Sequence, residues 1–331
     1  MSSAMAFVNT GVSRWIILRL CERAELRDPS QRPGANDCRF RGVTIGRLES
    51  IAAAAGKGYS TREYYDSAHP GSKEMSHLRL LWAYRHLVWE LVVRDIKVRY
   101  KRSVLGIVWT MLSPLLNMIV LTLVFSTILK QSIANYAIFF MTGQIYWSFF
   151  ASATGYAAAQ TDDANEIAKR IFVPRSVFVV SSVGVALVNL VLSMVPLGAI
   201  LLVLRFPFHP TWWFVPISIL LAIGFSTGVG FLIFTLASRF SDVREMYMVI
   251  LNTLFFLTPI VYAPAIVPRK YRIVLWFNPH FYLIHTFRDP IYEGRLPSGY
   301  ILLISVAVSV GALAVGWVYF CRNVNEFAFK N

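Results

Sequence analysis

The stretch VFVVSSVGVALVNLVLSMVPLGAILLVL, residues 177–204, decides the fold of this chain. Its 28 residues include no Asp, Glu, Lys, Arg or His. A helix needs about 20 predominantly apolar residues to cross the hydrocarbon core of a bilayer. The stretch therefore predicts a transmembrane helix.

Five further stretches of the same character lie on either side of it. They also lack charged residues and histidine, and they cover Val104–Leu129, Tyr136–Tyr156, Trp212–Ala237, Met246–Val267 and Gly299–Cys321. The sequence therefore predicts an all-α, polytopic membrane protein with six transmembrane helices in residues 104–331. An even number of spans places both termini on the same side of the membrane.

The composition is typical of a membrane protein. Of the 331 residues, 56% are hydrophobic and 15% charged, whereas soluble domains are about 45–50% apolar and about a quarter charged. These proportions exclude a disordered chain and argue against a soluble globule. The net charge is +14, and the distribution of Lys and Arg favours both termini in the cytoplasm. A basic cluster within residues 268–297 argues for the opposite orientation.

Residues 1–74 differ from the rest of the chain. They are basic, interrupted by Pro and Gly, and without a sustained hydrophobic period, so we expect a disordered N-terminal extension. Gly56-Lys57-Gly58 resembles a phosphate-binding loop. The earlier glycine of that motif is replaced by Ile51, however, and Gly58 stands where Ser or Thr must follow the lysine. The sequence therefore offers no ATPase motif.

Residues 75–103 precede the first predicted span. The section Leu78–Lys101 has apolar and charged side chains on opposite helical faces, and Glu90 pairs with Arg94 at i,i+4. We expect an amphipathic helix in the cytoplasmic interface, with basic groups toward anionic headgroups. It serves either as an anchor or as a docking surface for a partner. Its apolar face consists of Leu81, Tyr84, Val88, Leu91, Val92 and Ile96.

A second amphipathic helix is predicted for residues 157–172, between the second and third spans. Acidic residues lie in its first turns and basic residues in its last turn, which suits the helix dipole, and Pro174 follows it. Its exposed charges suit a surface that receives force from a partner; a solvated connector is the alternative. The charged residues considered for coupling here are Asp163, Glu166, Lys169 and Arg170.

The segment 268–297 is too apolar for a plain loop. Apolar and aromatic runs flank Asn278-Pro279, which predicts two half-helices that dip into the membrane or lie on its outer surface. An aromatic belt at the membrane interface is the alternative.

The spans contain only neutral polar side chains. Ion-driven transporters bind their ions through titratable groups within the membrane, and an intramembrane enzyme needs acids, bases or metal ligands near its site. His280 and His285 have no carboxylate partner at ligand spacing. We therefore predict that the chain is not an enzyme and holds no metal or cofactor.

Aromatic residues crowd the second and fifth spans. Packing against lipid is one interpretation. The other is a conduit whose aromatic faces stack on sugar rings while the polymer remains free to slide. The candidate lining residues are Tyr146, Trp147, Phe150, Phe255, Phe256 and Tyr262.

Five short motifs stand out along the chain: RDIKVRYKRSVLG at 94–106, RIFVP at 170–174, FSDVR at 240–244, TPIVY at 258–262 and Asn278-Pro279. Together they resemble the ABC-2-type polysaccharide exporter permeases, which export O-antigen, capsule or teichoic acid. The resemblance covers residues 78–331 and is specific as a combination.

The resemblance implies a homodimer of permease subunits that works with two copies of a separate ABC ATPase subunit, which binds ATP and Mg²⁺. It implies an undecaprenyl-linked glycan as the substrate and the bacterial inner membrane, with its lipids, as the location. Nothing in the sequence indicates a nucleic-acid partner. Rival functions are an ABC-2 exporter of a drug or lipid, a membrane-embedded glycan-modifying enzyme, and a structural membrane subunit.

The resemblance also assigns roles to particular segments. It adds Glu90 and Arg94 to the ATPase-coupling set and places the half-helices of residues 268–297 at the periplasmic exit. At the entrance, Arg94, Arg99 and Arg102 are candidates for contact with the phosphates of a lipid headgroup. Docking against the ATPase is the alternative use of these arginines.

Overall fold

The computed structural model of the chain describes residues 81–101, 106, 108–128, 135–162, 164 and 173–323. Every regular element in these residues is a helix, which confirms the predicted all-α class. The predicted extension, residues 1–74, lies outside the described residues.

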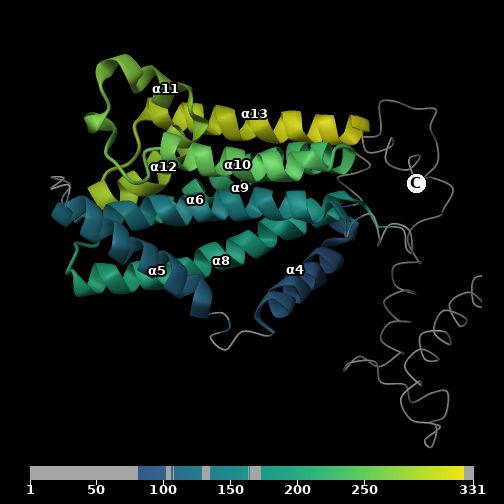
Figure 1. Cartoon of the computed structure of the whole chain (residues 1–331), viewed down its shortest axis with the longest axis horizontal. Helices are drawn as coiled ribbons and strands as arrows, with labels where there is room; N and C mark the ends of the chain where they lie inside the picture. Colours follow the sequence, from purple (N-terminus) through teal and green to yellow (C-terminus); the bar gives the residue numbers. More distant parts are fainter. Residues whose placement is uncertain are drawn as a thin grey trace, which may run out of the picture. The chain divides into compact units, whose positions relative to one another are not determined.

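The long helices form a bundle (Figure 1). Helices α6, α8, α9, α10 and α13 run side by side, α4 leans against α8 at one end, and α11 and α12 lie at the other end. We call these the α4 end and the α12 end. The long helices are α4 (Arg85–Tyr100), α5 (Val108–Thr122), α6 (Tyr136–Ala159), α8 (Ser176–Val203), α9 (Val215–Arg239), α10 (Asp242–Leu257) and α13 (Gly299–Asn323).

Short helical segments connect the long ones. The π-helical turn η2 (Leu123–Ile128) extends α5, and η3 (Pro210–Phe214) leads into α9. The remaining short segments follow α10 and are η4 (Pro264–Ile266), η5 (Arg269–Tyr271), α11 (Arg272–Phe277), α12 (Pro279–Arg288) and η6 (Asp289–Glu293).

Four helical stretches in the described residues are long and apolar enough to cross a membrane. They are Val108–Phe125, Ser176–Val203, Pro210–Arg239 and Gly299–Asn323. α6 has 24 residues, but its Gln, Thr, Ser and Tyr side chains lower its mean hydropathy. α10 has 16 residues and is too short to be counted among these stretches. The structure thus supports a multi-pass membrane protein, and the count of six spans stays a prediction.

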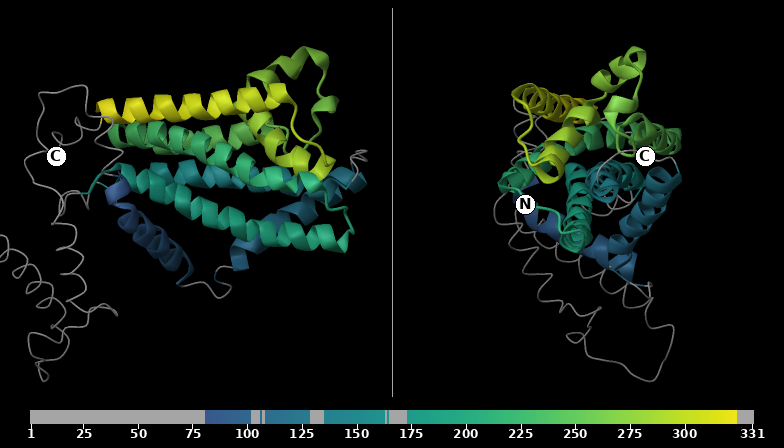
Figure 2. Two further views of the ribbon diagram at one scale, coloured as in Figure 1. Left: turned by 180° about the vertical axis from the view of Figure 1, so that it is seen from behind. Right: turned by 90° about the vertical axis from the view of Figure 1, so that its left-hand side faces the viewer.

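Helices α9 and α13 approach each other at two glycines. A Cβ atom on Gly228 would overlap the backbone of Ala312 and Leu313, and one on Gly316 would overlap the Gly228 carbonyl. Small residues allow such close packing where lipid is as apolar as the helix surface. α13, drawn in yellow, lies at the edge of the bundle in both views of Figure 2, so this seam holds a peripheral helix in place.

The fifth predicted span is shorter than the sequence suggested. The sequence predicts continuous helix over Met246–Val267. In the structure, α10 ends at Leu257, and residues 258–263 are not helical. Pro259 explains the end, because the residue before a proline is driven out of the helical conformation. The break leaves the last carbonyls of α10 without partners in their own helix.

The segment that follows contains two short helices, α11 and α12, which meet at Asn278. The Asn278 Oδ1 atom accepts a hydrogen bond from the backbone N–H of His280 at 3.0 Å, and Pro279 occupies the first turn of α12. Asn278 is thus an N-cap and Pro279 a favoured first helical residue. The insertion of these helices into the membrane stays a prediction.

Candidate functional site

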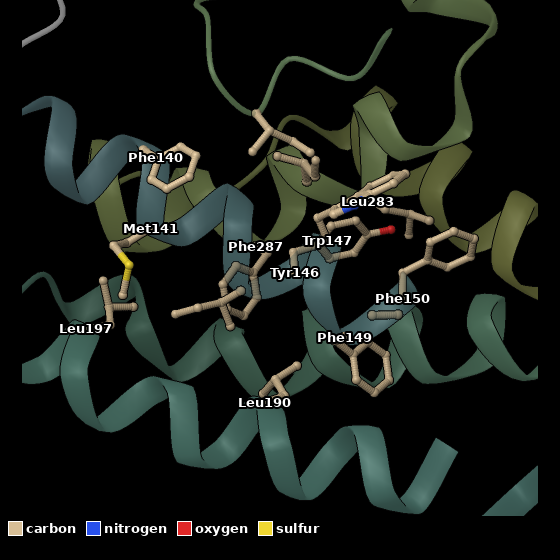
Figure 3. Close-up of a cluster of buried hydrophobic side chains, with 14 of the residues drawn as sticks. Phe140, Met141, Tyr146, Trp147, Phe149, Phe150, Leu190, Leu197, Leu283 and Phe287 are labelled. Atoms are coloured by element: carbon tan, nitrogen blue, oxygen red, sulfur yellow. The ribbon is translucent and has the colours of Figure 1, made fainter. Parts of the chain in front are cut away.

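An aromatic cluster surrounds the imidazole of His280 in the interior of the bundle. The His280 ring centroid lies 4.2 Å from that of Phe150 and 5.2 Å from those of Trp147 and Phe225, each with edge-to-face geometry. The Tyr146 hydroxyl lies 3.3 Å from the His280 Nδ1 atom. Figure 3 shows Tyr146, Trp147 and Phe150 of α6 among the buried hydrophobic side chains of the core.

Burial determines the charge of this histidine. His280 is 2% exposed, and its enclosure lowers its pKa to about 3. Burial in an apolar environment disfavours the charged form of an imidazole. The ring is therefore neutral at pH 7 and joins α12 to α6 as an aromatic packing element.

The predicted conduit residues separate into an interior and an exterior group. Tyr146, Trp147 and Phe150 are buried, and Phe255 joins them through an edge-to-face contact with Trp147 at 5.9 Å. Phe256 is 72% exposed. The Tyr262 hydroxyl donates a hydrogen bond to the Phe256 carbonyl at 3.2 Å. Within one chain, three of the six predicted residues are therefore buried in the core, where their rings lie against His280.

Few side chains of helix α10 are buried. It buries Tyr247 and Leu251, whereas Asn252 and Thr253 are exposed beside large apolar side chains. A polar amide is costly when it faces lipid and is tolerated when it faces water or a partner. The exposed face of α10 is therefore a candidate contact surface.

Helix α4 packs on the bundle through the face predicted from the sequence. Leu91 and Val92 are buried, and Val88 packs against the same cluster together with Tyr84, which precedes the helix. Trp89 of α4 is exposed, and so is Trp82, which lies before the helix. Neither tryptophan was among the predicted residues.

Polar contacts fasten α4 to the bundle. The Gln160 amide donates from Nε2 to the Asp95 carboxylate at 2.6 Å. Arg99 donates to the Tyr156 hydroxyl and places its guanidinium carbon 4.2 Å from the centre of that ring. Both of these arginines of the proposed headgroup entrance are exposed, but their partners differ, since Arg94 pairs with Asp95 at 2.8 Å within α4 and Arg99 contacts Tyr156 of α6.

The chain just after α6 is tied to α10. Arg244, near the start of α10, donates from its Nη2 atom to the Thr161 hydroxyl at 2.8 Å and to the Asp162 carboxylate at 2.9 Å. Of the predicted coupling residues, Glu90 and Arg94 are exposed on α4. The remaining four lie outside the described residues, as does Arg102 of the proposed headgroup entrance; the four are Asp163, Glu166, Lys169 and Arg170.

Side chains from α6, α12 and the α11–α12 junction bind the broken end of α10. Arg288 donates from Nη1 to the Pro259 carbonyl at 2.9 Å and from Nη2 to the Ile260 carbonyl at 3.4 Å. The Tyr136 hydroxyl donates to the Val261 carbonyl at 2.7 Å. The Asn278 amide donates to the Thr258 hydroxyl at 2.9 Å. Irregular backbone at membrane depth is tolerated where the protein satisfies it in this way.

Arg288 is a buried cation. Its side chain is among the largest that are fully buried, and burial lowers its pKa to about 10, so it stays charged at pH 7. A buried charge is expensive unless it is hydrogen-bonded or paired. Its neighbour Asp289 bonds to His285 at 2.9 Å. The sequence pattern indicates Arg288 only as part of a basic loop and gives no sign of its burial.

The described residues contain no group of three His, Cys, Asp or Glu side chains placed to hold a metal ion. Their polar clusters lie at the two ends of the bundle and fasten helices to one another.

Comparisons with known proteins give one family. The family model described as ABC-2 type transporter matches residues 86–292. An O-antigen export system permease protein, RfbA, of Myxococcus xanthus is 31% identical over 255 residues, which cover 76% of this chain and 97% of the relative. RfbA of Klebsiella pneumoniae is 30% identical over 213 residues, covering 64% and 82%. The polysialic acid transport protein KpsM of Escherichia coli is 20% identical over 235 residues, covering 68% and 89%.

Proposed function

Because this chain belongs to the ABC-2 type transporter family, we propose that it is the permease subunit of an ATP-driven exporter that moves a lipid-linked polysaccharide across the bacterial inner membrane. The similarity to the O-antigen export permease of Myxococcus xanthus carries this proposal, since it extends over nearly the whole of that relative. The name of the polysialic acid transport protein supports the same class of cargo.

A separate ATPase subunit, present in two copies, supplies the energy. The absence of a complete phosphate-binding loop from the sequence supports this division of labour. ATP and Mg²⁺ are then bound by the partner, and both termini of the permease, with the α4 end, face the cytoplasm. The α12 end faces the periplasm and forms the exit.

The conduit lies between two copies of the chain. Burial of Tyr146, Trp147 and Phe150 supports this placement, since side chains that fill the core of one copy do not face a passage. The exposed face of α10, with Asn252 and Phe256, suits a passage for a hydrated glycan, because it offers both an amide and an aromatic surface.

Arg94 is our candidate for the lipid phosphate at the entrance. It is exposed at the α4 end, on the same helix as the exposed Trp89, a residue type that suits the membrane interface. Arg99 is also exposed, but its contact with Tyr156 of α6 suits a role in holding α4 on the bundle.

The test is reconstitution. The tagged full chain is purified from its native membrane, its ATPase partner is identified by mass spectrometry, and the complex is placed in sealed vesicles with lipid-linked glycan extracted from the same cells. We expect ATP-dependent movement of the glycan into a protected compartment. Vesicles with the permease alone, and vesicles with a hydrolysis-deficient ATPase, are the controls. Movement by the permease alone, chemical modification of the glycan, or transport of a drug or simple lipid in its place would contradict the proposal.

A further inference from the structure

Helix α10 is sparsely packed along its length and fastened at both ends. Between the ends it buries only Tyr247 and Leu251 among the described side chains. At the α4 end, Arg244 holds Thr161 and Asp162. At the α12 end, the carbonyls that follow the helix are held by Arg288 and Tyr136.

The contact at the α4 end is more than a surface ion pair. An exposed pair contributes little by itself, and the Asp162 side chain is 72% exposed. The second acceptor, the Thr161 hydroxyl, belongs to a residue that is 1% exposed. Arg244 therefore binds a buried position within the segment 157–172, so displacement of that segment also displaces the start of α10.

The contact at the α12 end joins α10 to the exit. The Arg288 side chain belongs to α12, and a Cβ on Gly143 of α6 would overlap its guanidinium, so the cation lies in a cradle that a larger residue would fill. Two adjacent carbonyls after α10 share this guanidinium. Movement of the end of α10 therefore also displaces α12, because a buried cation cannot lose both acceptors cheaply.

We propose that α10 acts as a rigid helix that transmits a displacement from the segment after α6 to α11 and α12. Arg244 and Arg288 are the positioning residues at its two ends. A hydrogen-bonded helix is stiff along its axis, and 16 residues extend about 24 Å. Rigid helices linked by hydrogen bonds carry coupling between distant sites. This inference rests on the proposed function.

The experiment uses the assembled complex with its ATPase. Spin labels are placed at two exposed positions of the α12 end, Ile273 on α11 and Val203 on α8, and their separation is measured without nucleotide and with bound ATP. Export per ATP hydrolysed is measured in parallel. The variants are Arg244→Gln and, at the far end, Tyr136→Phe, which removes one hydroxyl only. Arg322→Gln, which removes an arginine from the exposed end of α13, is the matched control.

The wild-type complex should change its label separation when ATP binds, and Arg322→Gln should behave in the same way. Arg244→Gln and Tyr136→Phe should each at least halve this change, and Arg244→Gln should lower export per ATP about fivefold or more while hydrolysis continues.

Two results would overturn the proposal: a wild-type complex whose labels do not respond to ATP, or retention of the full response in both variants. Failure of the unmodified complex to export any glycan would count against the proposed function. This outcome is distinguishable from failure of the α10 proposal, because it is seen in the wild-type complex before any variant is compared.

Discussion

The guanidinium carbon of Arg288 lies 3.8 Å from the centre of the Phe139 ring. A cation over an aromatic face gains more when both are removed from water. This contact, the two carbonyl acceptors and the missing side chain of Gly143 together form the cradle of the buried charge.

The cradle predicts the effect of filling it. Gly143→Ala should lower the free energy of unfolding by about 1–3 kcal/mol, since the added methyl group would overlap the Arg288 guanidinium. Thermal unfolding of the detergent-solubilised protein measures this. Gly198→Ala on α8 is the control, because a methyl group added there would have no neighbour within 4 Å. Equal melting temperatures for the two variants would show that the cradle is not closely packed.

The close contact between α9 and α13 predicts that two glycines differ in their tolerance of a larger side chain. Gly228→Val should weaken resistance to unfolding by sodium dodecyl sulfate, because the backbone of α13 fills the space beside it. Gly311→Val places the same side chain on α13 at a position with open space and should change little. A Gly228 variant as resistant as the wild type would contradict the backbone contact.

The pKa of His280 predicts a dependence of stability on pH. Its value of about 3 lies below the ordinary 6.5, so the unfolded chain binds the proton more readily. The stabilising contribution is complete above pH 6.5 and is lost as the pH falls from 6.5 toward 3. At pH 5 the loss amounts to about 2 kcal/mol.

A comparison of variants isolates this histidine. The wild type should lose thermal stability between pH 7 and pH 5 more steeply than His280→Gln, whose side chain does not titrate. The groups nearest the imidazole are aromatic rings and the Tyr146 hydroxyl. Parallel stability profiles would show that the ring is charged or accessible in the folded protein.

The hydrogen bond between Asp95 and Gln160 should stabilise the docking of α4 on the bundle. Asp95→Ala should speed amide hydrogen exchange in α4 roughly tenfold, because a bond to a charged group contributes about 1.5–3 kcal/mol. Exchange followed by mass spectrometry measures this. Glu90→Ala removes an exposed carboxylate from the same helix and should leave exchange unchanged. Slow exchange in both variants would show that α4 is held without the Asp95–Gln160 hydrogen bond.

The predicted coupling helix of residues 157–172 has its own test. Glu166→Lys combined with Arg170→Glu reverses the charge pattern of its outer face while conserving net charge. We expect ATP hydrolysis by the complex to continue without export, and insertion into the membrane to be normal. Wild-type export by this double variant would remove the basis for the coupling role.

Local sequence features predicted much of the architecture. The charge-free stretch at residues 177–204 corresponds to α8 within one residue at each end, and Asn278-Pro279 marks the junction of α11 and α12. These features depend on interactions along the chain, namely hydrophobic length, N-capping and the restricted backbone of proline. The break at Pro259 depends on the same local rule, which the prediction of a continuous span from 246 to 267 overlooked.

The sequence by itself therefore determined that this chain is helical and apolar enough for a membrane, and it placed most helix ends. Only the tertiary structure decided that Tyr146, Trp147 and Phe150 surround His280, that Trp89 of α4 is exposed, and that Arg288 is buried. The physical reason is that lipid, protein core and an aromatic passage are all apolar, so hydropathy along a helix does not distinguish them. Which face meets which environment is fixed by contacts between residues far apart in the sequence.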